Sequence, residues 1–345
     1  MGRVEDIFDY SRLPFVIAEV ALSHDGSLGL AHAFIDAVAR TGVDAIKYQT
    51  HIAEAESSAL ETFRVQFSKA DATRYDYWRR TEFTEAQWVG LKEHAEEKGL
   101  VFLSSPFSIE AVNLLDRIGV AAWKVPSGET GSRRMLERMA RTGRPMLVST
   151  GMSAYGEVDE IVKRLDALCA KRYAVFQSTT QYPTPPEVVG MNVLGEYMRR
   201  YDCPIGLSDH SGTIFPSLIA CWRGARLIEV HVTLSRDMSG PDLSSSLTVD
   251  QLTLLVQGIR FVHTMRSNPV IKDVIAAEKG ELRRLYGKSA IATRTLKVGE
   301  IVNEQDVTFR KPGHGLSERT FDAYLGRKLK QPVAKGKFFE EEDFE

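Results

Sequence analysis

The feature of this sequence that most limits its fold is a unit that recurs eight times from residue 15 onward. Each unit starts with a short apolar run of strand length, continues through a polar loop, and ends in a stretch with the apolar spacing of a helix. The eight predicted strands begin at Phe15, Asp44, Leu100, Ala121, Pro145, Tyr173, Pro204 and Arg226. Strands that alternate with helices in this way predict an α/β fold with a parallel sheet.

Eight parallel units favour a (β/α)8 TIM barrel, because closure of the sheet buries strands that are apolar on both faces. A doubly wound open sheet is the alternative. It is disfavoured because no G-x-G-x-x-G turn, which marks dinucleotide binding in such sheets, follows the strand at Phe15. Capping-box spacing at Thr84 with Gln87, and at Thr248 with Gln251, predicts where two of the helices start.

The alternation of strands and helices stops after the eighth unit, which divides the chain into three predicted parts. We expect the barrel over residues 1–268, a charged linker over 269–288 and a small domain over 289–345. From Ser289 the sequence has short β runs separated by Gly and Pro turns. A domain of about 57 residues is only marginally stable by itself, so we expect it to dock onto a barrel.

Charge and cysteine content exclude several classes of protein. Lys plus Arg is 44 and Asp plus Glu is 46, so the net charge of −2 gives no reason to expect nucleic acid or an anionic membrane as a partner. Three cysteines without C-x-x-C spacing argue against a disulfide framework and a thiolate metal site, and they fit a reducing compartment. No apolar run approaches the length of a membrane span, and the N-terminus lacks a signal-peptide pattern. These features predict a cytoplasmic protein.

Polar side chains stand near the end of every predicted strand, which is where the active site of a barrel lies. They include Glu19, Lys47, Gln49, Ser105, Lys124, Ser127, Ser149, Thr180, Tyr182, Ser208, His210 and His231. A single Ser or Lys at such a position is more often simply exposed to solvent, with no role in catalysis. Lys47 and Lys124, however, stand inside apolar strands, and a buried ammonium is unfavourable without a counter-charge. We therefore predict that these two lysines form a site for a phosphate or a carboxylate.

His210 and His231 end neighbouring strands, so both imidazoles can point at one cation. Two satisfied core histidines are the alternative. Without a third strong ligand, a metal here is expected to be Mn²⁺ or Mg²⁺ in an oxygen-rich site and not a structural Zn²⁺. Because neutral imidazole is the ligand form, activity is then expected to fall below about pH 6. The histidines without a partner pattern, predicted to be structural or exposed, are His32, His51, His94 and His263.

Ten short motifs follow one another along the chain from the first predicted strand to the C-terminal domain. They are VIAEVALSHDG, DAIKYQT, FLSSPF, WKVPSGE, MLVSTGMS, YPTPPEVVGMNVL, GLSDHS, EVHVTL, GPD and FRKPGHG. Over residues 15–335 the chain thereby resembles the N-acetylneuraminate (sialic acid) synthase family. The resemblance implies a TIM barrel followed by an antifreeze-like (SAF, β-clip) domain, and condensation of phosphoenolpyruvate with an N-acetylated hexosamine such as N-acetylmannosamine. It also implies a divalent metal and a domain-swapped homodimer.

The resemblance assigns roles to the strand-end residues. Glu19 matches the family's catalytic carboxylate, and the predicted catalytic residues are Glu19, Lys47 and Lys124. His210 and His231 match the metal ligands. The phosphoenolpyruvate contacts match Lys47, Ser105, Lys124, Ser127, Ser149, Tyr182 and Ser208, and the sugar contacts match Gln49 and Asp242. Thr180 and Lys311, although they depart from the family pattern, are predicted to bind substrate as well.

The departures from the family pattern gather on the side of the sugar. They are Ser23, His24 and Asp25 in place of Asn-His-Asn, Thr180 in place of Asn, Leu243 in place of His, and Lys311 with His314 in a loop usually written Arg-Pro-Gly-Asn-Gly. In the family that Arg reaches the sugar of the neighbouring subunit, and a Lys does not reproduce its planar fork. The enolpyruvate chemistry is expected to be intact, while the identity of the sugar stays open.

Three functions are compatible with this pattern. The first is a nonulosonic acid (sialic acid-type) synthase, a transferase that releases phosphate. The second is another phosphoenolpyruvate–aldehyde condensing enzyme, for which a sugar phosphate acceptor would require an additional basic clamp. The third is a degenerate barrel with a glycan-binding C-terminal domain. This last function requires that the five predicted catalytic and metal-binding residues do not converge.

Overall fold

Eight parallel strands close into a barrel in the first of two compact units, Met1–Ser267. Each strand pairs with the next, and β1 also pairs with β8, where Phe15 lies opposite Leu227. The strands are β1 (Phe15–Ala21), β2 (Ala45–Thr50), β3 (Val101–Pro106), β4 (Trp123–Val125), β5 (Met146–Ser149), β6 (Tyr173–Ser178), β7 (Ile205–Asp209) and β8 (Leu227–Thr233). The TIM barrel is therefore confirmed, and the open sheet is excluded.

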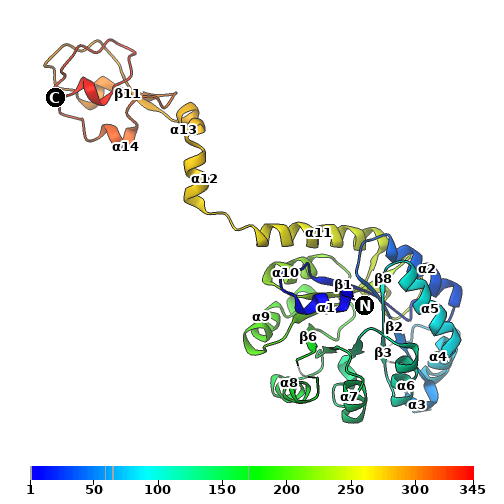
Figure 1. Ribbon diagram of the computed structural model, residues 1–345. Coiled ribbons are helices and arrows are strands. Elements are labelled where there is room, and N and C mark those ends of the chain that lie inside the picture. The colour runs from blue at the N-terminus through cyan, green and yellow to red at the C-terminus, as the bar shows by residue number, and fades with distance from the viewer. Residues whose placement is uncertain (1, 59, 64–65, 170) are drawn as a thin grey trace. The chain divides into compact units, whose positions relative to one another are not determined.

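The computed structural model describes residues 2–58, 60–63, 66–169 and 171–345. Helices surround the strands, as Figure 1 shows for the first unit. They are α2 (Leu28–Ala39), α5 (Glu85–Glu97), α6 (Ile109–Ile118), α7 (Arg133–Ala140), α8 (Tyr155–Cys169), α9 (Met191–Arg200), α10 (Phe215–Arg223) and α11 (Val249–Ser267). Three shorter helices are α1 (Gly2–Glu5), α3 (Ala53–Glu56) and α4 (Arg74–Thr81). In the described part of the chain, none of the helices has the length and apolar character that a membrane span requires.

The N-terminal segment closes the end of the barrel where the strands begin, a feature that the sequence pattern did not predict. Ile7, in a short 3-10 helix (Asp6–Phe8), is buried in the same apolar cluster as Phe15 and Leu227. The Arg226 guanidinium donates hydrogen bonds to the backbone carbonyls of residues 6, 7, 9 and 12. Because this segment covers the end where the strands begin, we expect the site at the carboxyl ends of the strands.

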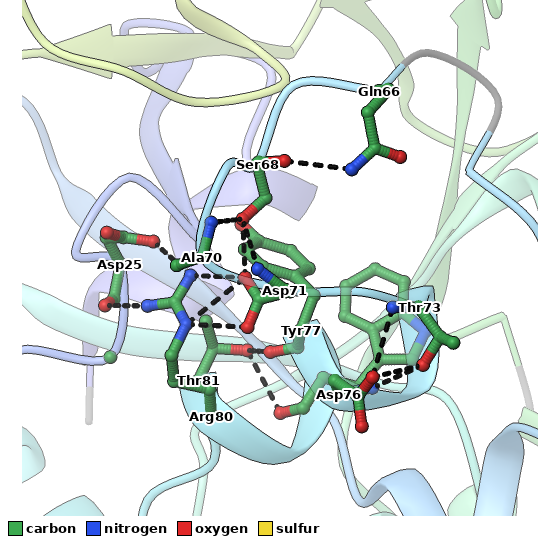
Figure 2. Close-up of polar contacts among 12 residues, drawn as sticks. Asp25, Gln66, Ser68, Ala70, Asp71, Thr73, Asp76, Tyr77, Arg80 and Thr81 are labelled. Atoms are coloured by element: carbon green, nitrogen blue, oxygen red, sulfur yellow. Dashed lines mark hydrogen bonds and ion pairs between the residues drawn. The ribbon is translucent and has the colours of Figure 1, made fainter.

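A polar network anchors the loop that follows β1 to helix α4 (Figure 2). Arg80 Nη2 lies 2.8 Å from Asp25 Oδ1 and 2.8 Å from Asp71 Oδ2. The next residue, Gly26, has a φ of +80°, and a Cβ there would lie 2.5 Å from the carbonyl oxygen of Arg80. Asp25 is one of the departures from the family pattern, and it holds this loop against α4.

The second unit, Asn268–Glu345, has a small core of its own. Its helices are α12 (Lys272–Glu278), α13 (Gly280–Tyr286) and α14 (Glu318–Phe321). The strands β10 (Ser289–Ala292) and β11 (Val307–Arg310) form an antiparallel pair. Phe321, Phe339 and Phe344 pack together in the core. In the first unit, a short strand that was not predicted, β9 (Ser246–Thr248), pairs in parallel with the end of β8.

Candidate active site

A cavity of about 760 Å³ lies at the carboxyl ends of the barrel strands. Its lining includes thirteen of the predicted site residues, which are Glu19, Lys47, Gln49, Ser105, Lys124, Ser127, Ser149, Thr180, Tyr182, Ser208, His210, His231 and Asp242. The predicted catalytic and metal-binding residues thus converge, which is the opposite of what a degenerate barrel requires. The remaining residue, Lys311, lies in the second unit, where its ammonium is 5.3 Å from the centre of the Tyr286 ring.

Two lysines and two glutamates form a buried charge cluster in the wall of the cavity. Lys47 Nζ lies 2.6 Å from Glu19 Oε2, and Lys124 Nζ lies 3.0 Å from Glu229 Oε1. Lys47 also approaches Glu229, with Nζ 3.8 Å from Oε2. All four side chains belong to residues that are at most 4% exposed. The counter-charges that the buried lysines require are therefore these two carboxylates.

Glu229 is a central residue that the sequence analysis missed. It stands in the apolar run of β8, two residues before His231. A carboxylate in a buried strand is as unusual as a lysine there, so the signal that singled out Lys47 and Lys124 was present at Glu229 as well.

The two carboxyl groups of the cluster differ in their affinity for a proton. Burial, together with the charge of Glu229, raises the pKa of Glu19 to about 7, against the opposing effect of Lys47. Burial acts in the same direction on Glu229, but the nearby Lys124 and Lys47 outweigh it and hold the pKa of Glu229 well below its usual range. Glu229 is therefore a permanent anion, whereas Glu19 exchanges a proton near neutral pH.

Hydroxyl groups complete the surroundings of the two lysines. Lys47 Nζ donates to Ser105 Oγ at 3.2 Å, and Lys124 Nζ donates to Ser149 Oγ at 2.7 Å. Next to them, the Gly151 backbone N–H donates to Ser127 Oγ at 2.9 Å. A Cβ on Gly151 would lie 2.6 Å from the hydroxyl oxygens of Ser178 and Thr180, so only glycine leaves these groups in place. The arrangement offers an anion both charge and hydrogen-bond donors.

The two candidate metal ligands face each other across the same cavity. The ring centres of His210 and His231 are 5.4 Å apart. His210 Nδ1 lies 2.8 Å from the carbonyl oxygen of Thr179, so this nitrogen carries the proton and Nε2 keeps its lone pair. His231 Nδ1 is buried without a hydrogen-bond partner among the described residues and lies 3.8 Å from Asp242 Oδ2.

This donor set fits a cation bound mainly by oxygen. Within the described residues, no three His, Cys, Asp or Glu side chains are grouped to hold a metal ion. The imidazoles of His210 and His231 would each supply one nitrogen, and the Asp242 carboxylate lies beside them. Water and substrate would then fill the remaining coordination positions.

The expected loss of activity below pH 6 is not supported by the environment of these rings. Burial lowers the pKa of His210 to about 4 and that of His231 to about 3. Both rings therefore stay neutral, and able to bind a metal, well below pH 6.

Three of the remaining histidines have partners that the sequence pattern did not reveal. His32 Nδ1 and His94 Nδ1 lie 2.9 Å apart on neighbouring helices. His51 is buried, with Glu56 Oε1 at 2.5 Å from Nδ1 and Gln49 Oε1 at 3.2 Å from Nε2. A buried His51 agrees with one of the two outcomes predicted for it, structural or exposed, but its contacts with Gln49 at the end of β2 and Glu56 in α3 were not visible in the sequence pattern.

Comparison with known proteins settles the family. Residues 34–270 match the NeuB family, and residues 287–345 match the SAF domain. The chain belongs to the NeuB family. The C-terminal unit, with its antiparallel pair of strands, corresponds to the SAF domain, so both halves of the predicted fold class are confirmed.

Relatives of this NeuB chain are similar over most of its length. It is 31% identical to N,N'-diacetyllegionaminic acid synthase of Campylobacter jejuni over 319 residues, which cover 90% of this chain and 94% of that protein. It is 33% identical to N-acetylneuraminate-9-phosphate synthase of Homo sapiens over 302 residues, or 86% and 82% of the two chains. The crystal structure of N-acetylneuraminic acid (sialic acid) synthetase from Leptospira borgpetersenii matches with a TM-score of 0.69 at 26% identity, covering 79% of this chain and 94% of that one.

Proposed function

We propose that this protein is a nonulosonic acid synthase, a transferase that condenses phosphoenolpyruvate with N-acetylmannosamine or a related N-acetylated hexosamine and releases phosphate. The observation that carries the proposal is the convergence of Lys47, Lys124, Glu19 and two neutral histidines on one cavity of a NeuB-family barrel. Two relatives are named as synthases, one of N,N'-diacetyllegionaminic acid and one of N-acetylneuraminate 9-phosphate, and they support the same class of reaction.

The two lysines and the surrounding hydroxyl groups form the binding site for phosphoenolpyruvate. With both lysines charged, Glu229 ionised and Glu19 protonated, the cluster carries a net charge of +1. The hydroxyls of Ser105 and Ser149, which contact the lysines, supply further donors. A small anion with several negative charges is expected to bind more tightly to such a site than a neutral ligand does.

Glu19 is the group that transfers protons during the reaction. The nucleophilic carbon of phosphoenolpyruvate attacks the aldehyde carbon of the open-chain sugar and forms the new carbon–carbon bond. Water then adds to the cationic carbon beside the phosphate, and the carbon–oxygen bond to phosphate breaks. Because its pKa is raised to about 7, the protonated Glu19 can first give its proton to the aldehyde oxygen, which becomes a hydroxyl, and the resulting carboxylate can then take a proton from the water that adds. The second proton of that water leaves with the phosphate as the ketone forms.

A divalent cation, Mn²⁺ or Mg²⁺, would be held by His210 and His231 beside Asp242, and when bound it would polarise the aldehyde oxygen as a Lewis acid. If this is right, a chelator abolishes activity and added Mn²⁺ restores it. The variant His231→Ala is expected to fold but to be inactive, because the ring is a ligand and lies at the edge of a cavity. Replacement of His263, which lies on α11 outside the cavity lining, is the control and should leave activity within about twofold. Full activity of the chelated protein would contradict the assignment.

Phosphate release from phosphoenolpyruvate, measured with a panel of N-acetylated hexosamines and their phosphates, tests the function directly. Among the described lining residues, the arginine is Arg74, and Glu61 neutralises it at 3.3 Å. The described lining thus adds no unpaired cation for a second phosphate, so we expect the unphosphorylated sugars to react faster. Release that requires a sugar phosphate would favour the second class of condensing enzyme, and no release with any sugar would refute the proposal.

We also propose a homodimer in the cytoplasm, in which the C-terminal domain of one subunit caps the barrel of the other. Exposed apolar side chains on two packed helices support a second copy as partner. They are Phe215, Ile219 and Trp222 on α10, and Leu254, Phe261 and Met265 on α11. The three cysteines are free thiols, which agrees with a reducing compartment.

Removal of residues 289–345 tests the role of the C-terminal domain. If it caps a barrel, the shortened protein should lose affinity for the sugar much more than for phosphoenolpyruvate, because the latter contacts lie in the barrel wall. The measurements are the two KM values and the mass in solution. A full-length protein that is monomeric and fully active would contradict the domain swap.

A further inference from the structure

A chain of hydrogen bonds leads from Glu19 away from the lysines and into the wall of the cavity. The Gln49 side-chain N–H donates to Glu19 Oε1 at 3.3 Å, and Gln49 Oε1 lies 3.2 Å from His51 Nε2. His51 Nδ1 in turn lies 2.5 Å from Glu56 Oε1. Gln49 and His51 come from the end of β2 and the residues just after it, and Glu56 ends the short helix α3.

The chemistry of these groups sets the direction of the bonds on either side of Gln49. In the structure the NH2 group of Gln49 faces Glu19 and its carbonyl oxygen faces His51, which is the direction required when Glu19 is ionised and only accepts. His51 must therefore carry a proton on Nε2. On its other side the ring is held by the contact between Nδ1 and Glu56 Oε1.

Loss of the proton on Nε2 would reverse the chain. His51 Nε2 would then accept, and the Gln49 amide would turn its NH2 group toward His51 and its carbonyl oxygen toward Glu19. Two oxygens would face each other there unless Glu19 carried a proton. The orientation of the amide that faces Glu19 thus depends on the His51 donor.

Two aromatic rings hold His51 so that only its edge is available for hydrogen bonds. The imidazole lies 4.0 Å from the Trp78 ring at an interplanar angle of 11°, and 4.2 Å from the Phe107 ring at 17°. The residue is 6% exposed. A ring stacked on both faces is kept in one plane, and both of its nitrogens are engaged in that plane.

We propose that His51, held by Glu56 and stacked between Trp78 and Phe107, is a positioning residue that fixes the direction of the Gln49 amide and thereby the donor presented to Glu19 and to the acceptor sugar. The proposal rests on the function proposed above, because it places the acceptor at Gln49. One N–H of the amide is bonded to Glu19, and the other is directed to an oxygen of the acceptor. The lysines that hold phosphoenolpyruvate have no part in this chain.

Two variants separate the hydrogen bond from the stacking. His51→Phe keeps an aromatic ring between Trp78 and Phe107 but removes both hydrogen bonds. His51→Gln removes the ring but can place an amide N–H near the position of Nε2. We expect His51→Phe, which leaves the buried Glu56 carboxyl group and the Gln49 carbonyl oxygen without their partner, to melt lower than the parent but to stay folded. It is expected to keep the KM for phosphoenolpyruvate within about twofold and to lose about tenfold to a hundredfold in kcat/KM for the acceptor. His51→Gln is also expected to melt lower than the parent and yet to retain more of that kcat/KM than His51→Phe.

The opposite order of the two variants, or kinetics of His51→Phe equal to those of the parent, would show that His51 is only a packing residue and would overturn the proposal. A second measurement does not depend on turnover. In the full-length protein labelled with ¹⁵N-histidine, the signal that disappears in His51→Phe should show a proton on Nε2, and a bare Nε2 would overturn the proposal. If the parent releases no phosphate with any sugar, the proposed function fails, and the labelling result still decides whether His51 is a donor.

Discussion

The Glu19→Gln variant is expected to fold normally and to bind phosphoenolpyruvate, but to turn over at least a hundredfold more slowly than the parent. Gln keeps the shape of the side chain but cannot accept a proton. The alternative hypothesis is that Glu19 is only the ion-pair partner of Lys47, whose Nζ lies 2.6 Å away. Loss of a purely structural partner in the interior should lower the free energy of unfolding by about 3 to 5 kcal/mol.

The proton affinity of Glu19 distinguishes the two hypotheses. Because burial raises the pKa of Glu19 to about 7, the side chain is already partly neutral at physiological pH. Lys47 keeps a second carboxylate, Glu229, at 3.8 Å. A neutral group at position 19 therefore leaves no uncompensated charge. A variant that melts much earlier than the parent, or that turns over within a few fold of it, would contradict the proton-transfer role.

The same pKa predicts how phosphoenolpyruvate affinity changes with pH. As the pH rises through about 7, Glu19 loses its proton and adds a negative charge beside the binding site for phosphoenolpyruvate. Affinity in the parent should therefore fall between pH 6 and 8, beyond the change caused by titration of the ligand itself. Calorimetric titration of the parent and of Glu19→Gln across this range measures the difference, since the variant has no group that ionises at position 19. Parallel curves would show that Glu19 does not titrate there.

The Glu229→Gln variant is expected to lose about 3 to 5 kcal/mol in the free energy of unfolding. Glu229 pairs with Lys124 at 3.0 Å and accepts a hydrogen bond from Ser208 at 2.9 Å, and no other carboxylate lies within 4.0 Å of the Lys124 ammonium among the described residues. Its removal leaves a buried ammonium without a counter-charge. In contrast to Glu19, Glu229 has a pKa held low by the lysines, so a neutral side chain here differs from the native charge state.

A surface carboxylate provides the matched control for this measurement. Glu137 pairs with Arg133 at 2.7 Å, and the Arg133 side chain is 72% exposed. Glu137→Gln should change the free energy of unfolding by no more than about 0.5 kcal/mol. Urea denaturation of both variants at neutral pH makes the comparison. Equal effects would show that burial does not decide the role of Glu229.

The stabilising effect of Glu229 also has a defined pH range. Because its pKa in the folded protein lies below the usual value of 4.5, the stabilisation is present above about pH 4.5 and is lost as the pH falls below it. The difference in the free energy of unfolding between parent and Glu229→Gln should narrow accordingly on acidification.

The strands and the end of the barrel that holds the site were predictable from the sequence. All eight strands begin within two residues of the predicted positions, because strands buried on both faces appear as short apolar runs between polar loops. Parallel strands in a closed barrel bring their carboxyl ends to one side. The prediction of a barrel therefore implied that residues at strand ends, such as Lys47, Ser149 and His210, lie around one cavity.

Which of these groups carry charge was decided by tertiary structure alone. Lys124 and Glu229 are 105 residues apart in the chain, and only closure of the barrel places their charged atoms 3.0 Å from each other. The stacking of His51 on Trp78 and Phe107 likewise joins three separate segments. Desolvation and charge pairing depend on neighbours from every surrounding element, and so the proton affinity of a buried side chain cannot be derived from the residues next to it in sequence.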